Sequence, residues 1–391
     1  MKKFLSLFSL ITFILLILVQ SIDAIPAFAR KYNMSCQTCH APFPRLKPYG
    51  DEFAGNGFKL ADKEAPRYFI ETGDDELSLL REIPVALRLE GYATYNNLKS
   101  NKTDFSAPYL LKFLSGGNIS QSISYYFYFF FSERGEVAGV EDAFLMFNDL
   151  FSQNLDLYVG QFQISDPLFK RELRLTFEDY QLYRAKPFKS KANLTYDRGI
   201  MLTYGLPTGT DIVFEVLNGN GIGAANEYKI FEDDNYKNFF GRLSQDIIEG
   251  IRLGAFAYFG KEKISNEIPP ANFTNTFNMF GPDMTLNYDD IIEFNFQYGV
   301  RKDKEPKFGI KDIETKGGFG ELIYTPDRDN SLWYLVGLYN WIDSEDPSLV
   351  TKSATLGLGY LLRRNIRLIG EFTNNFERKY SQFTVGVISA F

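Results

Sequence analysis

The feature that most constrains the fold is an alternation of apolar and polar side chains that recurs from about residue 83 to the C-terminus. Successive side chains of an extended strand point to opposite faces, so this alternation predicts strands with one apolar and one polar face. Residues 291–300 give a clear example, whose apolar face holds Ile292, Phe294, Phe296 and Tyr298. Strands with an apolar outer face and a polar inner face are typical of outer-membrane barrels. The sequence therefore predicts an all-β fold in which residues 83–391 form an antiparallel barrel.

The connections between these runs indicate the size and orientation of the barrel. About sixteen runs can be counted, and short connections alternate with long ones, as in barrels with short periplasmic turns and longer external loops. Residues 116–118 are expected to form a short turn, and residues 132–139 and 164–195 to form long loops. An even number of strands places both ends of the barrel on the periplasmic side. A soluble β-sandwich is the alternative fold, which the aromatic content and the leader disfavour.

Charged residues in the long loops suggest two opposite selectivities. The loop at 164–195 is rich in lysine and arginine, and it is the third external loop of the predicted barrel, a loop that commonly folds inward in sixteen-stranded porins. A basic constriction there would favour anions, whereas a solvated loop is the alternative. Acidic residues at 232–234 and 343–346 could instead collect cations such as ferrous iron through oxygen ligands.

Composition agrees with a barrel and excludes some functions. Hydrophobic residues make up 45% of the chain although its mean hydropathy is -0.20, so apolar residues must be interleaved with polar ones. After the leader no apolar run reaches the roughly 18 residues of a membrane-spanning helix. The net charge of -7 argues against nucleic-acid binding.

Residues 1–24 are predicted to be a secretory signal peptide. Lys2 and Lys3 supply the positive start, residues 4–19 are apolar, and cleavage is expected after Ala24, with Ala29 as the alternative. No cysteine lies at the cleavage region, which argues against a lipoprotein. The mature chain is therefore expected to reach the outer membrane.

One short motif dominates residues 25–82, which lie between the leader and the barrel. Cys36, Cys39 and His40 form C-x-x-C-H and include both cysteines and the only histidine of the chain. In c-type cytochromes the two thiols of this motif attach haem covalently, and the imidazole binds the iron. A thioredoxin-like dithiol would need a βαβ context, which the sequence does not indicate. We predict one covalent haem c, attached at Cys36 and Cys39, with His40 as the axial iron ligand.

The rest of this segment suits a small haem-binding unit that plugs the barrel. It is too short to bury a core of its own, so the haem must serve as part of its core. Apolar residues expected to form a wall for the porphyrin are Leu46, Tyr49, Phe53 and Phe58. Residues 61–82 are acidic and are either a solvated linker or a docking patch for a basic electron carrier.

The second axial ligand cannot be assigned from the sequence. No further histidine exists, and an oxygen or nitrogen ligand or an open position remains possible. The methionines that follow the leader are Met34, Met146, Met201, Met279 and Met284.

The N-terminal region resembles a known family. Pro26-Ala27-Phe28-Ala29-Arg30-Lys31-Tyr32, then Cys36 to His40, then Pro44-x-Leu46-x-x-Tyr49-Gly50-x-x-Phe53-x-x-x-Gly57-Phe58 is similar to the start of outer-membrane fused monohaem cytochrome–porins. The resemblance covers residues 26–58 and implies Cys36 and Cys39 as thioether sites and His40 as axial ligand. Tyr49-Gly50 stands where the family usually has Phe-Gly. The best-known members of the family are iron oxidases.

These observations lead to one functional hypothesis and two alternatives. The resemblance implies an electron conduit in the outer membrane, with its haem in the lumen or on the periplasmic side. It would accept electrons from extracellular Fe(II) and pass them to a periplasmic c-type cytochrome, as an Fe(II):cytochrome c oxidoreductase. One alternative is electron transfer with another donor or acceptor. The other is an anion-type porin in which the haem segment is a plug or sensor.

Overall fold

The computed structural model describes residues 27–60, 83–98, 102–120, 122–232, 234–267 and 270–391. The predicted signal peptide (1–24) and the acidic residues 61–82 lie outside the described residues. None of the described helices is both long enough and apolar enough to cross a membrane.

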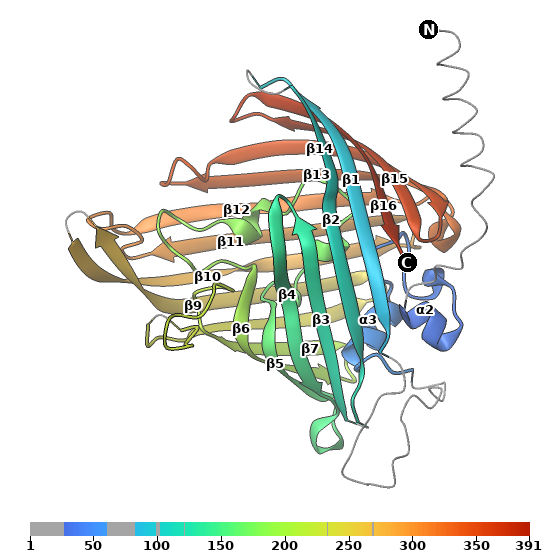
Figure 1. Ribbon diagram of the computed structural model, residues 1–391, viewed down its shortest axis with the longest axis horizontal. Helices are drawn as coiled ribbons and strands as arrows, with labels where there is room; N and C mark the ends of the chain where they lie inside the picture. Colours follow the sequence, from blue (N-terminus) through green and yellow to red (C-terminus); the bar gives the residue numbers. More distant parts are fainter. Residues whose placement is uncertain (1–26, 61–82, 99–101, 121, 233, 268–269) are drawn as a thin grey trace.

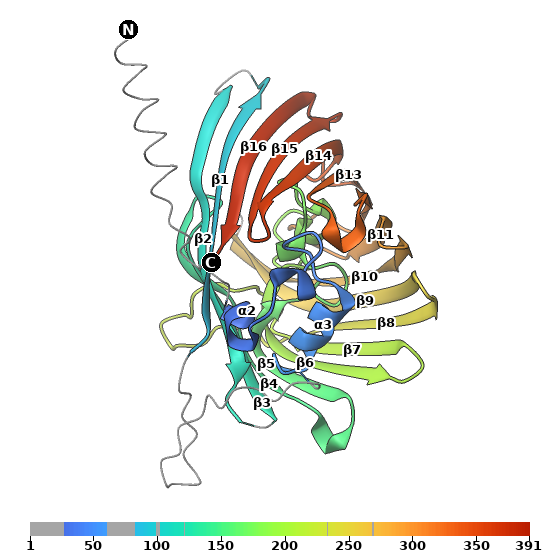
Figure 2. The same cartoon turned by 90° about the vertical axis from the view of Figure 1, so that its right-hand side faces the viewer.

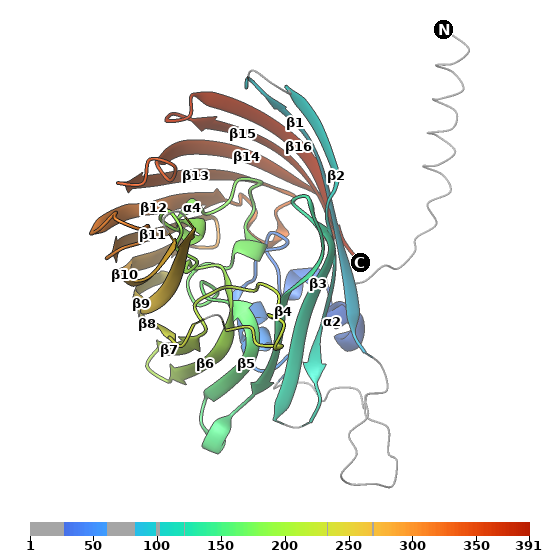
Figure 3. The same cartoon turned by 60° about the vertical axis from the view of Figure 1, so that its left-hand side comes forward.

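Sixteen strands of the described chain close into one antiparallel barrel, in which sequence neighbours pair and the last strand pairs with the first (Figures 1 and 3). The predicted number of strands is confirmed. The strands are β1 (Val85–Asn96), β2 (Thr103–Asn118), β3 (Ile123–Glu133), β4 (Glu136–Phe147), β5 (Leu155–Gln163), β6 (Tyr196–Leu206), β7 (Thr210–Leu217), β8 (Asn238–Ile248), β9 (Ile251–Glu267), β10 (Pro270–Tyr288), β11 (Ile292–Asp303), β12 (Ile313–Tyr324), β13 (Trp333–Ser344), β14 (Thr351–Arg363), β15 (Ile366–Asn375) and β16 (Tyr380–Ala390). Two short 3-10 helices, η2 (Leu150–Ser152) and η4 (Arg328–Asn330), lie between strands.

The side chains of the barrel face outward and inward as the alternation predicts. In β15, Leu368 and Phe372 are 40% and 50% exposed on the outer surface. Arg367 and Glu371 of the same strand are 2% and 3% exposed and hydrogen-bond to groups inside the barrel. The apolar exterior suits lipid, and the lumen is polar.

The connection between β3 and β4 is much shorter than predicted. Residues 132–139, expected to be a long loop, contain a tight hairpin in which only Arg134 and Gly135 lie between the strands. Their φ angles are 51° and 90°. Positive φ at both central residues suits the two-residue turn that matches the twist of paired strands.

Residues 116–118 were expected to form a short turn, but they are the last residues of β2. The glycine at 116 is required by packing, because a Cβ atom there would lie 2.9 Å from the ring of Phe58. The small residues therefore mark a close contact between the barrel wall and the N-terminal segment.

Residues 27–60, here called the mouth segment, occupy one opening of the barrel (Figure 2). They form α2 (Ala27–Tyr32), the 3-10 helix η1 (Cys36–Thr38) and α3 (Pro48–Gly55). Proline is well suited to the first turn of a helix, where its missing N–H needs no partner, so α3 begins at Pro48. This opening is the one beside the C-terminus, where the short turns lie (Figure 2).

Polar contacts join the mouth segment to opposite sides of this opening. Asn148, between β4 and β5, donates its Nδ2 to the carbonyl of Gly55 at 3.1 Å. Between β12 and β13, Asp329 forms an ion pair with Lys47. The segment is therefore tied across the opening.

Residues 164–195, here called the inward segment, leave β5 and run inside the barrel before β6 begins (Figure 3). They contain the 3-10 helix η3 (Arg171–Leu173) and the short helix α4 (Gln181–Arg184). The Tyr180 hydroxyl donates to Glu321 of β12 at 3.0 Å, and the backbone N–H of Phe177 donates to Glu371 of β15 at 2.7 Å. Of the two alternatives that the sequence leaves open for this connection, an inward fold and a solvated external loop, the structure shows the inward fold.

Candidate cofactor site in the barrel mouth

A single turn of 3-10 helix brings the C-x-x-C-H motif together. The Ser35 hydroxyl caps this turn by accepting a hydrogen bond from the Gln37 N–H at 3.3 Å. The N–H groups of Cys39 and His40 both donate to the Cys36 carbonyl, at 3.2 Å and 2.9 Å. Because the chain turns back within these residues, both thiols and the imidazole lie along one short stretch.

The His40 ring has the hydrogen bonding expected of an iron ligand. Its Nδ1 lies 2.8 Å from the carbonyl of Pro44 and 3.3 Å from that of Arg45. Carbonyl oxygens only accept, so Nδ1 carries the proton and Nε2 is left with its lone pair. A ligating histidine typically donates its other ring N–H to such a partner. Burial lowers the pKa of His40, although both carbonyls oppose this, and favours the neutral ring that coordination requires.

The thiols differ from those of a redox dithiol. Burial raises the pKa of Cys36 and Cys39. A reactive C-x-x-C pair usually has a lowered thiol pKa and lies in a βαβ unit. The described chain has a barrel and no βαβ unit, so the thioredoxin-like alternative has no structural support.

The motif opens into a lumenal cavity of about 1400 Å³ that all three motif residues line. This volume exceeds the roughly 300–1,000 Å³ of most ligand pockets. Apolar side chains from the mouth segment and from β3 to β5 cover one side of it, and these are Phe28, Met34, Phe53, Phe58, Tyr126, Phe144, Met146 and Tyr158. Two thiols, an imidazole and an apolar wall around such a volume fit a covalently attached haem.

The aromatic wall continues from the mouth segment into the barrel. Phe28 stacks on Phe58 with ring centroids 4.9 Å apart, and Phe58 stacks on Tyr126 of β3 at 5.5 Å. Tyr126 then contacts Phe144 of β4 at 5.6 Å. The predicted wall residues Phe53 and Phe58 are therefore only part of a wall that the barrel completes.

The cavity also narrows the choice of a second iron ligand. Met34, Met146 and Met201 line it, whereas Met279 and Met284 do not. The sequence alone could not separate these residues.

Gly50 of α3 gives a direct test of how the motif is packed. A Cβ atom on Gly50 would collide with the backbone carbonyl of Cys39, whereas one on Gly55 of the same helix would meet nothing within 4 Å. Gly50→Ala should therefore displace the motif and lower the covalent haem content severalfold. Gly55→Ala should leave it unchanged. Haem absorbance per purified chain measures both, and equal haem content in the two variants would contradict the packing argument.

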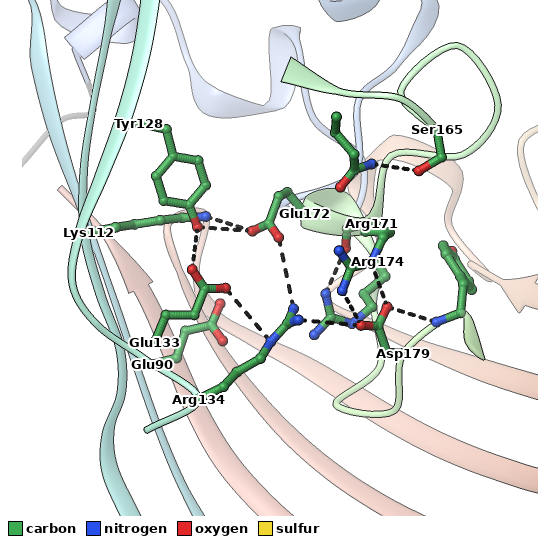
Figure 4. A network of polar contacts seen from close by, with 12 residues as sticks. Glu90, Lys112, Tyr128, Glu133, Arg134, Ser165, Arg171, Glu172, Arg174 and Asp179 are labelled. Carbon is green, nitrogen blue, oxygen red and sulfur yellow. Dashed lines mark hydrogen bonds and ion pairs between the residues drawn. The ribbon is translucent and has the colours of Figure 1, made fainter. Parts of the chain in front are cut away.

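A network of ion pairs inside the barrel holds the inward segment (Figure 4). The Lys112 ammonium of β2 lies 2.6 Å from a carboxylate oxygen of Glu172. Arg171 pairs with Asp179 through two nitrogens, and Arg134 lies 3.5 Å from the same carboxylate. The predicted basic constriction is thus neutralised in part by acidic residues that sequence reasoning missed.

These acidic groups remain charged. Burial alone would raise the pKa of Glu172, but Lys112 and the neighbouring arginines outweigh it and hold this pKa well below its usual range. Burial likewise opposes ionisation of Asp179, yet Arg171 and Arg174 keep its pKa below the usual value. The inward segment is therefore held by fully ionised pairs at neutral pH.

Known proteins resemble this chain in fold alone. No family model and no curated protein matches it. A loop-deletion variant of OmpT from Vibrio cholerae has a TM-score of 0.56 at 11% identity, and the match covers 79% of this chain and 99% of that one. The anion-selective porin of Comamonas acidovorans has a TM-score of 0.55 at 12% identity, with 79% and 99% covered. The channel DcaP of Acinetobacter baumannii has a TM-score of 0.53 at 12% identity, with 79% and 97% covered. The chain has the fold of an outer-membrane porin.

Within this porin fold, the acidic stretches of the outer loops serve as anchors for the loops. Glu232 pairs with Lys237. Asp346 accepts hydrogen bonds from the N–H groups of Phe188 and Ser348, at 2.6 Å and 3.0 Å. The described acidic residues of 232–234 and 343–346 do not gather into a metal site. Asp233 lies outside the described residues.

Proposed function

We propose that this protein carries electrons across the outer membrane by means of one haem c held in the barrel mouth. For each electron, an extracellular Fe(II) ion is oxidised to Fe(III) and one periplasmic c-type cytochrome is reduced. The observation that carries the proposal is the meeting of Cys36, Cys39 and His40 at a lumenal cavity large enough for haem.

A haem bound here would supply an iron centre that takes up and gives up one electron at a time. The residues of the chain have separate tasks around it. Cys36 and Cys39 would fix the group covalently, and the His40 imidazole, oriented by the Pro44 carbonyl, would bind the iron. The aromatic wall would exclude water from one face of the cavity.

The position in the lumen supports a conduit more than a simple carrier. The apolar band of an outer-membrane barrel is about 25 Å tall, and charge does not cross it unaided. A site inside the barrel shortens the distance that an electron must travel from an external donor.

Anaerobic mixing with Fe(II) tests this function. The purified holoprotein in detergent should develop the reduced haem α-band on addition of Fe(II), with close to one electron accepted per chain. In liposomes that enclose a soluble c-type cytochrome, external Fe(II) should reduce the enclosed cytochrome only when the protein is present. A haem that dithionite reduces but Fe(II) does not would exclude Fe(II) as donor and favour another redox partner.

The second candidate is an anion-type porin in which the mouth segment is a plug, and the fold likeness to the Comamonas acidovorans porin favours it. Planar-bilayer recordings separate the two functions. For the conduit we expect a conductance far below that of an open sixteen-stranded porin, because the mouth and inward segments both occupy the lumen. A large, anion-selective conductance with an inert haem would support the porin instead.

A further inference from the structure

Three carboxylates meet inside the barrel, away from the C-x-x-C-H motif. One oxygen each from Glu133, Glu141 and Glu172 lies within 4.8 Å of the other two. Glu133 ends β3, Glu141 belongs to β4, and Glu172 comes from the inward segment. Glu133 lies beside the β3–β4 hairpin, at the barrel end opposite the mouth segment.

An irregularity in the β3–β4 pairing explains why two consecutive acidic residues, Glu141 and Asp142, can both face the interior of the barrel. The register shifts between Phe127 and Phe129, where β4 uses one residue more than β3. Such a bulge breaks the strict alternation of side chains and can turn both neighbours to one face. Asp142 lines the lumenal cavity, and Glu141 joins the carboxylate group.

Several oxygens of this group and of Asp142, the next residue after Glu141, lack partners within the described chain. Glu141 Oε2, Asp142 Oδ1 and Glu172 Oε1 are buried and accept no hydrogen bond there. Asp142 is only 6% exposed, and its carboxylate interacts electrostatically with Glu141 and Glu172. Buried carboxylate oxygens without partners are costly, so their convergence indicates a bound positive group.

The side-chain cations nearby do not satisfy these oxygens. Lys112 binds the other oxygen of Glu172, and Arg134 lies 3.7 Å from Glu133 Oε1. The guanidinium of Arg134 is 3.9 Å from Glu172 Oε1, which is too long for a hydrogen bond. Arg174 donates to the carbonyl of Arg171. Glu141 Oε2 and Glu172 Oε1 therefore receive no hydrogen bond from these cations.

We infer that Glu133, Glu141 and Glu172 form a site for a divalent cation that prefers oxygen ligands. Oxygens up to 4.8 Å apart can share one ion, because metal–oxygen bonds of this class are about 2.0–2.6 Å long. The group contains no thiolate or imidazole, which suits hard cations. Only the naming of the physiological ion rests on the proposed function, which makes it Fe(II).

The position of the site gives it a role in that function. Glu172 also lines the cavity that the C-x-x-C-H motif lines. An Fe(II) ion entering from the loop end would therefore be held at the edge of the candidate haem chamber. The site would concentrate the donor there and orient it for electron transfer.

Manganese binding tests the site without relying on activity. Mn(II) alone, added to the purified full-length holoprotein, should lose its free-ion EPR signal with close to one ion bound per chain. Glu141→Gln replaces a ligand oxygen without breaking any ion pair described above, and it should weaken binding by at least about tenfold. Glu314→Gln, which alters a half-exposed carboxylate paired with Lys302 and Lys316, is the matched control and should bind as the wild type does.

Two readouts keep the result interpretable. Heat-modifiable migration on gels and haem content must match the wild type, which shows that each variant is folded.

Absence of Mn(II) binding to the wild type, or unchanged binding by Glu141→Gln, would overturn the site and leave the conduit standing. Mn(II) binding without any reduction of haem by Fe(II) would overturn the conduit and leave the cation site standing. If both hold, Glu141→Gln should raise the Fe(II) concentration needed for half-maximal reduction.

Discussion

Replacing both Cys36 and Cys39 with serine should abolish the covalent haem and leave the barrel folded. Serine hydroxyls do not form the thioethers that attach haem c, so haem staining after denaturing electrophoresis should fall to background. The barrel should survive because its sixteen strand pairings all lie within residues 85–390. Heat-modifiable migration measures the folded barrel independently of haem.

Thr38→Ser is the matched control for this variant, since Thr38 lies between the two cysteines and takes no part in attachment. It should stain as the wild type does. Covalent staining that persists in the double serine variant would refute the assignment of the motif. Loss of the barrel together with the haem would instead mean that the mouth segment is needed for closure.

Breaking the Arg171–Asp179 pair should release the inward segment and open the lumen. Both side chains are buried, 3% and 7% exposed, and removal of one partner from such a pair typically costs about 3–5 kcal/mol. Arg171→Met should therefore raise the bilayer conductance severalfold and expose residues 164–195 to protease while the strands stay intact. Arg184→Met, on an exposed arginine of the same segment, is the control and should change neither.

The double variant Arg171→Met/Asp179→Met sharpens this test. It also removes the buried Asp179 carboxylate, which the single variant leaves with only the longer 3.5 Å ion pair to Arg134, and apolar pairs of similar volume are often as stable as the ion pair they replace. The double variant should therefore regain much of the closed state. If it conducts as strongly as Arg171→Met, a contact other than the charge pair holds the segment.

Much of the fold was predictable because a membrane barrel imposes a local rule. In a strand between lipid and lumen, successive side chains alternate between the outer and inner faces. The faces of residues 291–300 could therefore be predicted from that stretch of sequence alone. The C-x-x-C-H motif is equally local, since its chemistry lies within five residues. Both could be found without knowing what any distant residue contacts.

The parts that could not be predicted depend on contacts between distant residues. Gly116 looks like a turn residue until Phe58 is seen packed against it. Lys112 and Glu172 are sixty positions apart and meet only because the inward segment folds back onto β2. The bulge that brings Glu141 into the lumen breaks the alternation on which strand prediction relies. A register shift of this kind leaves no clear signal in a single sequence.

The walls of the cavity have a consequence for the order of biogenesis. They include Arg88 of the first strand and Ala390 of the last, which pair only when the sheet closes. The pocket therefore does not exist while the chain is still an open sheet, although residues 27–60 precede every strand. A maturation enzyme that joins haem to Cys36 and Cys39 would find them more accessible before closure, because both are half-buried in the closed barrel. Cofactor loading would then act as a checkpoint that precedes insertion into the membrane.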